Sequence, residues 1–219
     1  MITKVNAIIN FFLLQIISIY FVTGQGYEES RLLLDKVSKN LLSKENMKFE
    51  FTYKLENSKE KITQEIEGTA QISGEKYKLN FMDVEQIYDG YKTYTIIPEN
   101  EEINIQSGDG NSDLMIKPTN LITFYTSGYG YEWDIKQIVM GRTIQYVKLL
   151  PIEEKSDVKY LLVGVDINNL NLFKIIEIGK NGTNTTLKIK NQSYNISLPE
   201  NHFNFDTELY KDYFINEDS

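Results

Sequence analysis

The segment Met47–Leu55 (MKFEFTYKL) alternates without exception between apolar and polar residues, and no other feature constrains the fold as strongly. In an extended chain successive side chains point to opposite faces, so the apolar residues of this segment share one face and the polar residues share the other. A strand of this kind is stable only where its apolar face is covered and its polar face meets water. The sequence therefore predicts a sheet with one buried face.

Further strands are predicted by the same criterion. In Lys61–Ser73 the apolar residues that share the buried face are Ile62, Ile66, Ala70 and Ile72. Asp89-Gly90 is a favoured two-residue hairpin turn between two β-rich runs. Other strands are predicted at Lys76–Met82, Tyr131–Ile135, Thr143–Leu150, Val158–Asp166, Leu172–Gly179, Thr185–Asn191 and Ser193–Ser197. About eleven strands joined by short turns make an antiparallel meander, which must curl to bury its apolar face.

Two segments are predicted to be helical and to cover that face. Glu28–Lys44 carries one apolar stripe, with acidic residues at its start and basic residues at its end, as the helix dipole favours. Leu121–Tyr125 follows Pro118 and is predicted to be a helix of two turns with proline in the first. The predicted fold class is mainly β (α+β), with a curled antiparallel sheet under an N-terminal helix and a short middle helix.

The first 24 residues differ from the rest. Lys4 is their only charged residue, and it precedes an interrupted apolar run, Ala7–Val22, and small residues near Gly24–Gln25. This is the pattern of a cleaved secretory signal peptide. The alternative is a retained membrane anchor, but a spanning helix needs about 20 apolar residues and this run is shorter. We expect a signal peptide at residues 1–24 and a single domain at residues 25–219.

Charge and cysteine content exclude several functions. The chain carries a net charge of −8, and without Lys4 its 23 basic residues become 22 against 31 acidic ones, a net charge of −9. Nucleic acid and anionic membrane surfaces repel such a chain, so no nucleic-acid partner is expected. The absence of cysteine excludes disulfides, cysteine-based zinc sites and thiol nucleophiles.

No catalytic or metal site is predicted. His202 is the only histidine, and it lies in a polar turn near the C-terminus. A catalytic triad would have to use it, and a single imidazole makes no metal cluster, so we expect an ordinary surface residue. The Ser107–Ser112 loop (SGDGNS) lacks the acid spacing of a calcium loop. The clustered acids are expected to form solvated faces rather than a glycosidase pair; they are Asp83, Glu85, Asp89, Glu99, Glu101 and Glu102. No cofactor motif is present.

What remains is the inner face of the sheet. An aromatic-rich concave face under helices predicts a hydrophobic binding cavity. The alternation alone is equally consistent with a filled core.

The order of several motifs resembles the periplasmic outer-membrane lipoprotein carriers, the LolA-like family, in the version of Bacteroidetes-type bacteria. The resemblance extends from Tyr27 to Phe214. Its most specific part is a K/R-F/Y-x-L strand followed by an I-x-D-G hairpin with aromatic residues and a closing proline. The matching residues are Lys76-Tyr77-Lys78-Leu79, Ile87-Tyr88-Asp89-Gly90, Tyr94 and Pro98, with Ile96 in place of the second aromatic. Later matches are LITFYTSGYGYEWDIK, IQYVKLLP, KNGTNTTLKI and FNFD.

This resemblance implies an unclosed antiparallel barrel of about eleven strands with a helical lid, and a binding protein rather than an enzyme. It implies a periplasmic monomer that accepts acylated lipoproteins from an inner-membrane lipoprotein-releasing ABC transporter and delivers them to an outer-membrane acceptor. A second hypothesis is an interaction domain of the same fold that senses envelope lipids or lipoproteins.

Residue roles follow from the resemblance together with the alternation. The residues expected to contact acyl chains are Phe49, Phe51, Tyr53, Ile72, Tyr77, Leu79, Phe81, Tyr94 and Ile96. The residues expected to form the lid are Leu34, Val37, Leu41, Leu121, Phe124 and Tyr125. The face on which Tyr94 lies depends on the strand register, since a shift of one residue reverses it.

The sequence departs from the family at one position that matters for the lid. Well-studied members carry an arginine in the turn before the K/R-F/Y-x-L strand, and this arginine closes the lid. That turn is Ser73-Gly74-Glu75 here, and the only arginines of the chain are Arg31 and Arg142. Lid control is therefore expected to differ.

Overall fold

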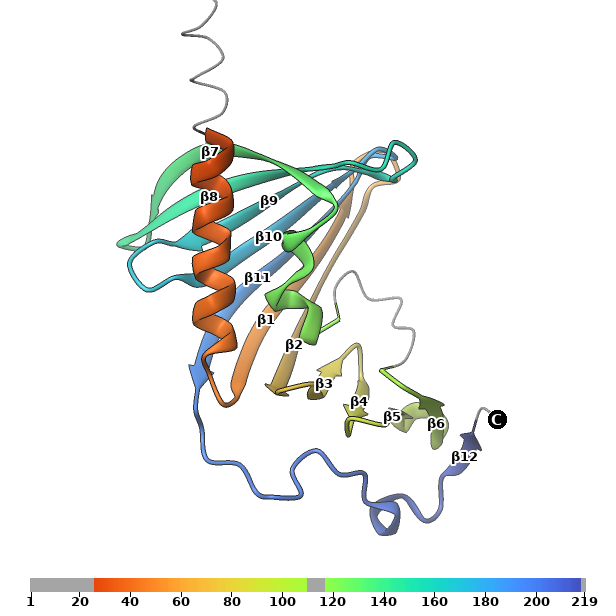
Figure 1. Ribbon diagram of the computed structural model, residues 1–219. Coiled ribbons are helices and arrows are strands. Elements are labelled where there is room, and N and C mark those ends of the chain that lie inside the picture. The colour runs from red at the N-terminus through yellow and green to blue at the C-terminus, as the bar shows by residue number, and fades with distance from the viewer. Residues whose placement is uncertain (1–25, 110–116, 218–219) are drawn as a thin grey trace, which may run out of the picture.

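The protein is mainly β, with one unclosed twelve-stranded sheet, one N-terminal helix at residues 26–42 and four short 3-10 turns (Figure 1). The computed structural model describes residues 26–109 and 117–217. The predicted signal peptide and residues 110–112 of the SGDGNS loop lie outside this range. Within it, the predicted fold class is confirmed.

The sheet consists of two meanders joined at their first and last strands. The strands are β1 (Met47–Asn57), β2 (Ile62–Ser73), β3 (Lys76–Phe81), β4 (Val84–Tyr88), β5 (Lys92–Ile97), β6 (Glu102–Ser107), β7 (Tyr129–Val139), β8 (Arg142–Pro151), β9 (Val158–Asp166), β10 (Asn171–Gly179), β11 (Thr183–Tyr194) and β12 (Phe214–Glu217). Their order is β12-β6-β5-β4-β3-β2-β1-β11-β10-β9-β8-β7, so β12 and β7 are the two edges. Strand β1 pairs with β2 on one side and with β11 on the other.

Two strand predictions were wrong in detail. Residues 185–197 do not form two strands, because β11 continues as one strand to Tyr194 with a register shift opposite Glu50 and Phe51. Strand β12 was missed, and it pairs parallel to β6, so the sheet is not purely antiparallel. All four residues of β12 are exposed, so it has no buried face that an alternating pattern would reveal.

The predicted hairpin at Asp89-Gly90 is present, but its turn is displaced by one residue. The Asp89 amide donates to the Lys92 carbonyl (3.2 Å), which leaves Gly90 and Tyr91 at the tip. Gly90 has φ +100°, which glycine adopts without strain. The Asp89 carboxylate accepts the amides of Tyr91 and Lys92, both at 2.8 Å. Aspartate therefore stabilises the turn from the position before it.

The N-terminal helix lies across the inner face of the sheet (Figure 1). The stripe predicted from the sequence is its buried side, because Leu34, Val37 and Leu41 are at most 1% exposed and belong to the main core cluster. This cluster also contains the inward residues of β1, β2, β3 and β8–β11.

The middle segment is not the predicted α-helix. It forms two 3-10 turns, η2 (Thr119–Ile122) and η3 (Phe124–Thr126). Thr123 separates them with φ −131° and ψ −8°, outside helical geometry. Four of the eight residues 119–126 are β-branched (Thr119, Ile122, Thr123 and Thr126), and such side chains lower helix propensity.

The outer face of β3–β6 is also covered, whereas the sequence analysis predicted a sheet with only one buried face. The chain after β11 passes below these strands in Figure 1 and ends as β12 beside β6. Phe205 from this segment stacks on Tyr94 with ring centroids 4.5 Å apart. They adjoin a separate buried cluster that contains Ile87, Ile96, Ile103 and Ile105.

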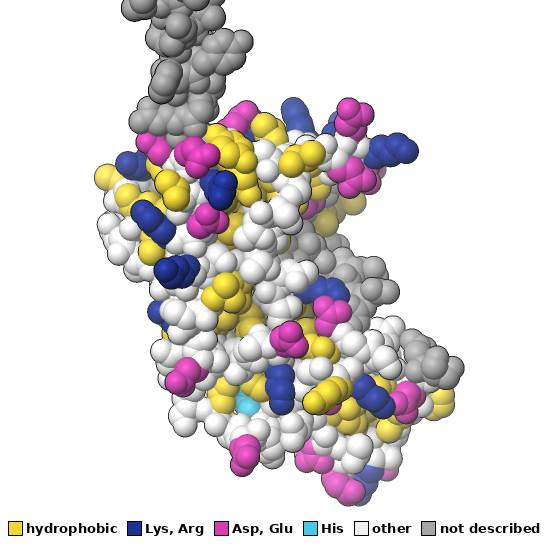
Figure 2. Space-filling view, in the orientation of Figure 1, with side chains coloured by type: hydrophobic (Ala, Val, Ile, Leu, Met, Phe, Trp, Pro, Cys, Tyr) yellow, Lys and Arg dark blue, Asp and Glu magenta, His cyan; other side chains and the backbone are white. Residues whose placement is uncertain are grey.

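His202 belongs to this covering segment and is not a free surface residue. It is half-buried, and its Nε2 lies 2.6 Å from the Gln71 Oε1 on the outer face of β2. Burial, with a smaller contribution from Lys78, lowers the pKa of the imidazole. In Figure 2 it lies low on the drawn face, away from the middle segment. Its role is therefore packing of the C-terminal segment.

We predict that Phe205→Ala lowers the free energy of unfolding by about 2 kcal/mol, since a half-buried phenylalanine contributes roughly half of the 3–5 kcal/mol of a fully buried one. Leu209→Ala is the matched control, because Leu209 lies in the same segment and is 73% exposed. Urea unfolding of both variants measures the difference. Equal stability of the two would show that the segment does not hold the outer face.

Candidate binding site

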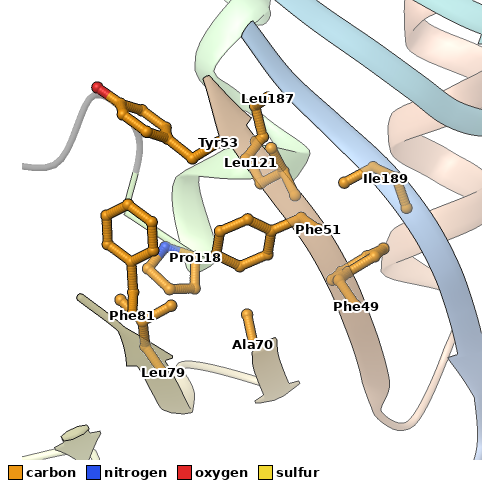
Figure 3. A pocket seen from close by; sticks show the side chains of 10 residues that line it. All are labelled: Phe49, Phe51, Tyr53, Ala70, Leu79, Phe81, Pro118, Leu121, Leu187 and Ile189. Carbon is orange, nitrogen blue, oxygen red and sulfur yellow. The ribbon is translucent and has the colours of Figure 1, made fainter. Parts of the chain in front are cut away.

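A small apolar cavity lies between the sheet and the middle segment, with a volume of about 50 Å³ (Figure 3). Ten side chains line it: Phe49, Phe51, Tyr53, Ala70, Leu79, Phe81, Pro118, Leu121, Leu187 and Ile189. The only polar atom among these side chains is the Tyr53 hydroxyl, which points away from the others in Figure 3. The chemistry of such a site is limited to burial of apolar groups.

Three adjacent strands build the aromatic wall. Phe51 in β1 is opposite Gly68 in β2, and Gly68 is opposite Phe81 in β3. The Phe51 ring lies over Gly68, where an added Cβ would clash with the Cζ atom of that ring. The rings of Phe51 and Phe81 then meet with centroids 5.7 Å apart, and Tyr53 contacts Phe81 at 5.2 Å. Gly68 is thus required for this wall, and the sequence analysis did not identify it.

The middle segment closes the cavity from the opposite side through Pro118 and Leu121. Leu121, Ile122 and Tyr125 are buried, and the Tyr131 hydroxyl donates to the Tyr125 carbonyl (2.7 Å). Among the described residues, no backbone ladder joins the two turns η2 and η3 to the sheet. Side-chain burial therefore holds this segment in place, and such segments open at lower free energy than paired strands.

The structure brings together five of the residues expected to contact acyl chains. These are Phe49, Phe51, Tyr53, Leu79 and Phe81. Ile72 and Tyr77 are fully buried in the same core but do not line the cavity. The lining residues that the sequence analysis did not assign to the site are Ala70, Pro118, Leu187 and Ile189. Alternation in β11 would have identified Leu187 and Ile189.

The prediction that Tyr94 and Ile96 share this face was wrong. Leu79 is opposite Gln86, and Gln86 is opposite Thr95, so the inner face of β5 carries threonines. Tyr94 and Ile96 point to the outer face, where the C-terminal segment covers them.

The inner polar residues form a connected network. The Tyr77 hydroxyl donates to Gln86 Oε1 (2.9 Å), and Gln86 Nε2 donates to Thr95 Oγ1 (3.3 Å). Thr93, which is not exposed, donates its hydroxyl to the Gly108 carbonyl (2.7 Å). Burial raises the pKa of Tyr77 to about 12, so its hydroxyl stays protonated and donating.

The residues expected in the lid fall into two groups. Leu34, Val37 and Leu41 pack in the core beneath the helix, apart from the cavity. Leu121 lines the cavity, and Tyr125 is buried nearby, where burial raises its pKa. Phe124 is half-buried and lines an open groove beside the cavity.

Neither arginine reaches the cavity. Arg31 lies 3.7 Å from Asp35 on the exposed side of the helix. Arg142 lies over the Phe173 ring, 5.1 Å from its centroid, in an outer-face cluster. In the turn where the resembling family has an arginine, the Ser73 hydroxyl donates to the Glu45 carbonyl (3.1 Å). The lid is therefore held by side-chain packing and the Tyr131–Tyr125 hydrogen bond, and not by an arginine.

The cavity is too small for an acyl chain as it stands. For comparison, an engineered cavity of about 150 Å³ in another protein binds one benzene molecule. The cavity of this protein has a volume of about 50 Å³, which is smaller than that benzene-binding cavity. A lipid-sized ligand enters only if the middle segment moves, and the described conformation is the filled one.

Within residues 26–109 and 117–217, no group of three or more histidine or acidic side chains is placed to hold a metal ion. No helix in that part of the chain is both long and apolar enough to cross a bilayer. Charged side chains of both signs are spread over the face drawn in Figure 2.

No family model matches the chain, and no curated protein matches it. Solved structures do match. An uncharacterized conserved protein from Thermus thermophilus aligns with a TM-score of 0.56 at 8% identity, over 87% of this chain and 99% of that one. A LolA superfamily protein from Nitrosomonas europaea gives 0.43 at 10% identity over 80% and 97%. LprF from Mycobacterium bovis gives 0.47 at 12% identity over 78% and 95%. The Thermus likeness establishes the fold, an open sheet, and nothing about the ligand.

We predict that Gly68→Val destabilises the protein by about 1–3 kcal/mol, because the new side chain forces Phe51 out of the wall, as overpacking does in other cores. Gly130→Ala is the control, since a Cβ there meets its nearest atom at 3.9 Å. Urea unfolding monitored by circular dichroism compares them. A Gly68→Val protein as stable as Gly130→Ala would contradict the role of the Phe51 ring.

Proposed function

We propose that this protein is a periplasmic lipoprotein carrier that sequesters acyl chains and moves lipoproteins from the inner to the outer membrane. One observation carries the proposal: an entirely apolar cavity is closed by a segment that only side chains hold. The motif order that resembles LolA-like carriers, in their Bacteroidetes-type version, supports the same function.

Acyl transfer needs a carrier because exposure of the chain to water is costly. Each buried CH₂ is worth about 0.8 kcal/mol, so a chain of about 16 carbons is worth on the order of 10 kcal/mol. Free passage between membranes is negligible at that cost. A carrier whose own lid refills the cavity lowers the net affinity enough for release.

In the open form, the acyl chains contact the wall residues of β1 and β3. The proposed contact residues are Phe49, Phe51, Tyr53, Ile72, Tyr77, Leu79 and Phe81. Tyr94 and Ile96 are excluded because they lie on the outer face. Leu121, Phe124 and Tyr125 form the moving lid, and the helix residues Leu34, Val37 and Leu41 support it from the core.

The partners in this proposal are acylated lipoproteins, an inner-membrane lipoprotein-releasing ABC transporter and an outer-membrane acceptor. Residues 1–24 act as the cleaved signal peptide, and the mature protein is a monomer. Because no arginine closes the lid, release depends on apolar exchange between lid and ligand.

We predict that Phe51→Asp abolishes binding of a triacylated lipopeptide, since a carboxylate on the wall must be dehydrated when the chains enter. Native mass spectrometry of the purified protein with the lipopeptide measures complex formation. Leu209→Asp, at an exposed site, is the control and retains binding. Circular dichroism confirms that the Phe51→Asp protein is folded, and Leu121→Asp provides a second variant should it unfold. Absence of lipopeptide binding by the folded unmodified protein would overturn the carrier proposal.

We predict that Leu121→Ala binds the same lipopeptide at least tenfold more tightly. Leu121 is 5% exposed, and its truncation removes about 2–5 kcal/mol from the closed form. A ligand that competes with closure gains affinity when the open fraction rises. Fluorescence titration with the unmodified protein as reference measures the ratio. Weaker binding by Leu121→Ala would mean that the side chain contacts the ligand rather than competes with it.

A further inference from the structure

One acidic residue, Glu177, lies among the buried residues on the inner face of β9, β10 and β11. In β10, Ile175 and Glu177 point to the same side, and Ile175 is a core residue that is 1% exposed. Glu177 is opposite Leu161 in β9 and Thr185 in β11, which are 3% and 6% exposed. The carboxylate is therefore half-buried between buried neighbours on the face that carries the cavity.

Glu177 has no ionic or hydrogen-bonding partner within the described part of the chain. None of the eight ion pairs there includes it, although eight other acidic residues are paired with lysine or arginine. Burial alone raises the pKa of its carboxyl group. An unpaired carboxylate on an apolar surface costs free energy, so a position of this kind calls for an explanation.

Tyr129 in β7 lies on the same face. Glu177 is opposite Leu161, Leu161 is opposite Leu149, and Leu149 is opposite Tyr131, two residues from Tyr129. Burial raises the pKa of the Tyr129 hydroxyl, and the negative charge of Glu177 raises it further. No hydrogen bond joins the Tyr129 hydroxyl to the Glu177 carboxylate. Among the residues that the structure describes, the phenol and the carboxylate both lack a hydrogen-bonding partner, and together they form a site for a group that donates hydrogen bonds.

The position relative to the cavity indicates which part of a ligand would reach this site. Leu187 lines the cavity and is opposite Ile175, one inward position from Glu177. Tyr129 lines an open groove of about 570 Å³ together with Phe124, Ser127 and Ser156. Glu177 thus lies one inward position beyond a strand pair that reaches the cavity, on the face that also carries the groove residue Tyr129. In the proposed complex, with acyl chains in the cavity, the head group lies beside Glu177.

We propose that Glu177, with Tyr129, binds a primary ammonium group carried next to the acyl chains of the ligand. This inference rests on the proposed carrier function and specifies its ligand class: a two-chain amphiphile with a free ammonium. Carboxylate and ammonium form a charge-assisted hydrogen bond, which is stronger than a neutral one and stronger still where water is partly excluded. The α-ammonium of a diacylated lipoprotein and the ethanolamine head group of a phospholipid share this chemistry.

The test compares two probes that differ at one nitrogen: a dipalmitoyl lipopeptide with a free α-amino group, which is charged, and the same lipopeptide N-acetylated, which is neutral there. Affinities are measured by fluorescence titration for the unmodified protein, for Glu177→Gln and for Glu65→Gln. Glu65 is the matched control because it is an exposed acid on β2. We expect the unmodified protein and Glu65→Gln to prefer the free amine by about tenfold. We expect Glu177→Gln to lose that preference while binding the acetylated probe unchanged.

The outcomes separate the inference from the function on which it rests. Equal affinity of the unmodified protein for both probes would overturn the ammonium site and leave the carrier function intact. No binding of either probe, or of the triacylated lipopeptide, would overturn both. If Glu177→Gln still binds the free amine more tightly than the acetylated probe, a group other than Glu177 binds the ammonium, and the ammonium site proposed at Glu177 is overturned. Phosphatidylethanolamine and its N-acetyl derivative, titrated in the same way, show whether the phospholipid head group uses the site.

Discussion

The pairing of β1 with β11 determines where every other strand lies. β1 begins one meander and β11 ends the other, so their ladder joins two sheets that would otherwise be separate. It also brings Phe49 and Phe51 of β1 beside Ile189 of β11 on one face. The register shift at Glu50/Phe51 lies within this ladder, and bulges of this kind increase the local twist. The cavity forms where the joined sheet curls.

The inner face of β1–β3 could be predicted from sequence because only one of their faces is apolar. Phe49, Phe51 and Leu79 alternate with charged or uncharged polar residues, so the alternation assigns only one face to the core. In β5, Tyr94 and Ile96 alternate with threonines, and the apolar pair points outward. The pattern shows which residues share a face, but it does not show which layer covers that face.

The covering layer comes from a segment without a regular pattern. Phe205 reaches Tyr94 from more than 100 residues along the chain, through an irregular stretch that no periodicity describes. Gly68 and the position of the middle segment on the sheet were also beyond the sequence. Each depends on a contact between distant residues, namely the ring of Phe51 over Gly68 and the packing of Leu121 on the sheet. Propensity and alternation are local, so they do not contain this information.

The near-filled cavity follows from how a reversible carrier must work. An empty apolar cavity of lipid size would either collapse or bind its ligand with the full burial energy of the chain, and release would then be slow. Here Leu121 and Pro118 occupy the wall when the ligand is absent. The ligand gains only the difference between its own burial and that of the lid, which is the quantity that sets a population shift. The length and packing of residues 118–126 therefore tune affinity without any change in the wall. A lid held by side-chain contacts rather than by strand pairing suits this exchange, because the ligand can replace the lid on the sheet one contact after another.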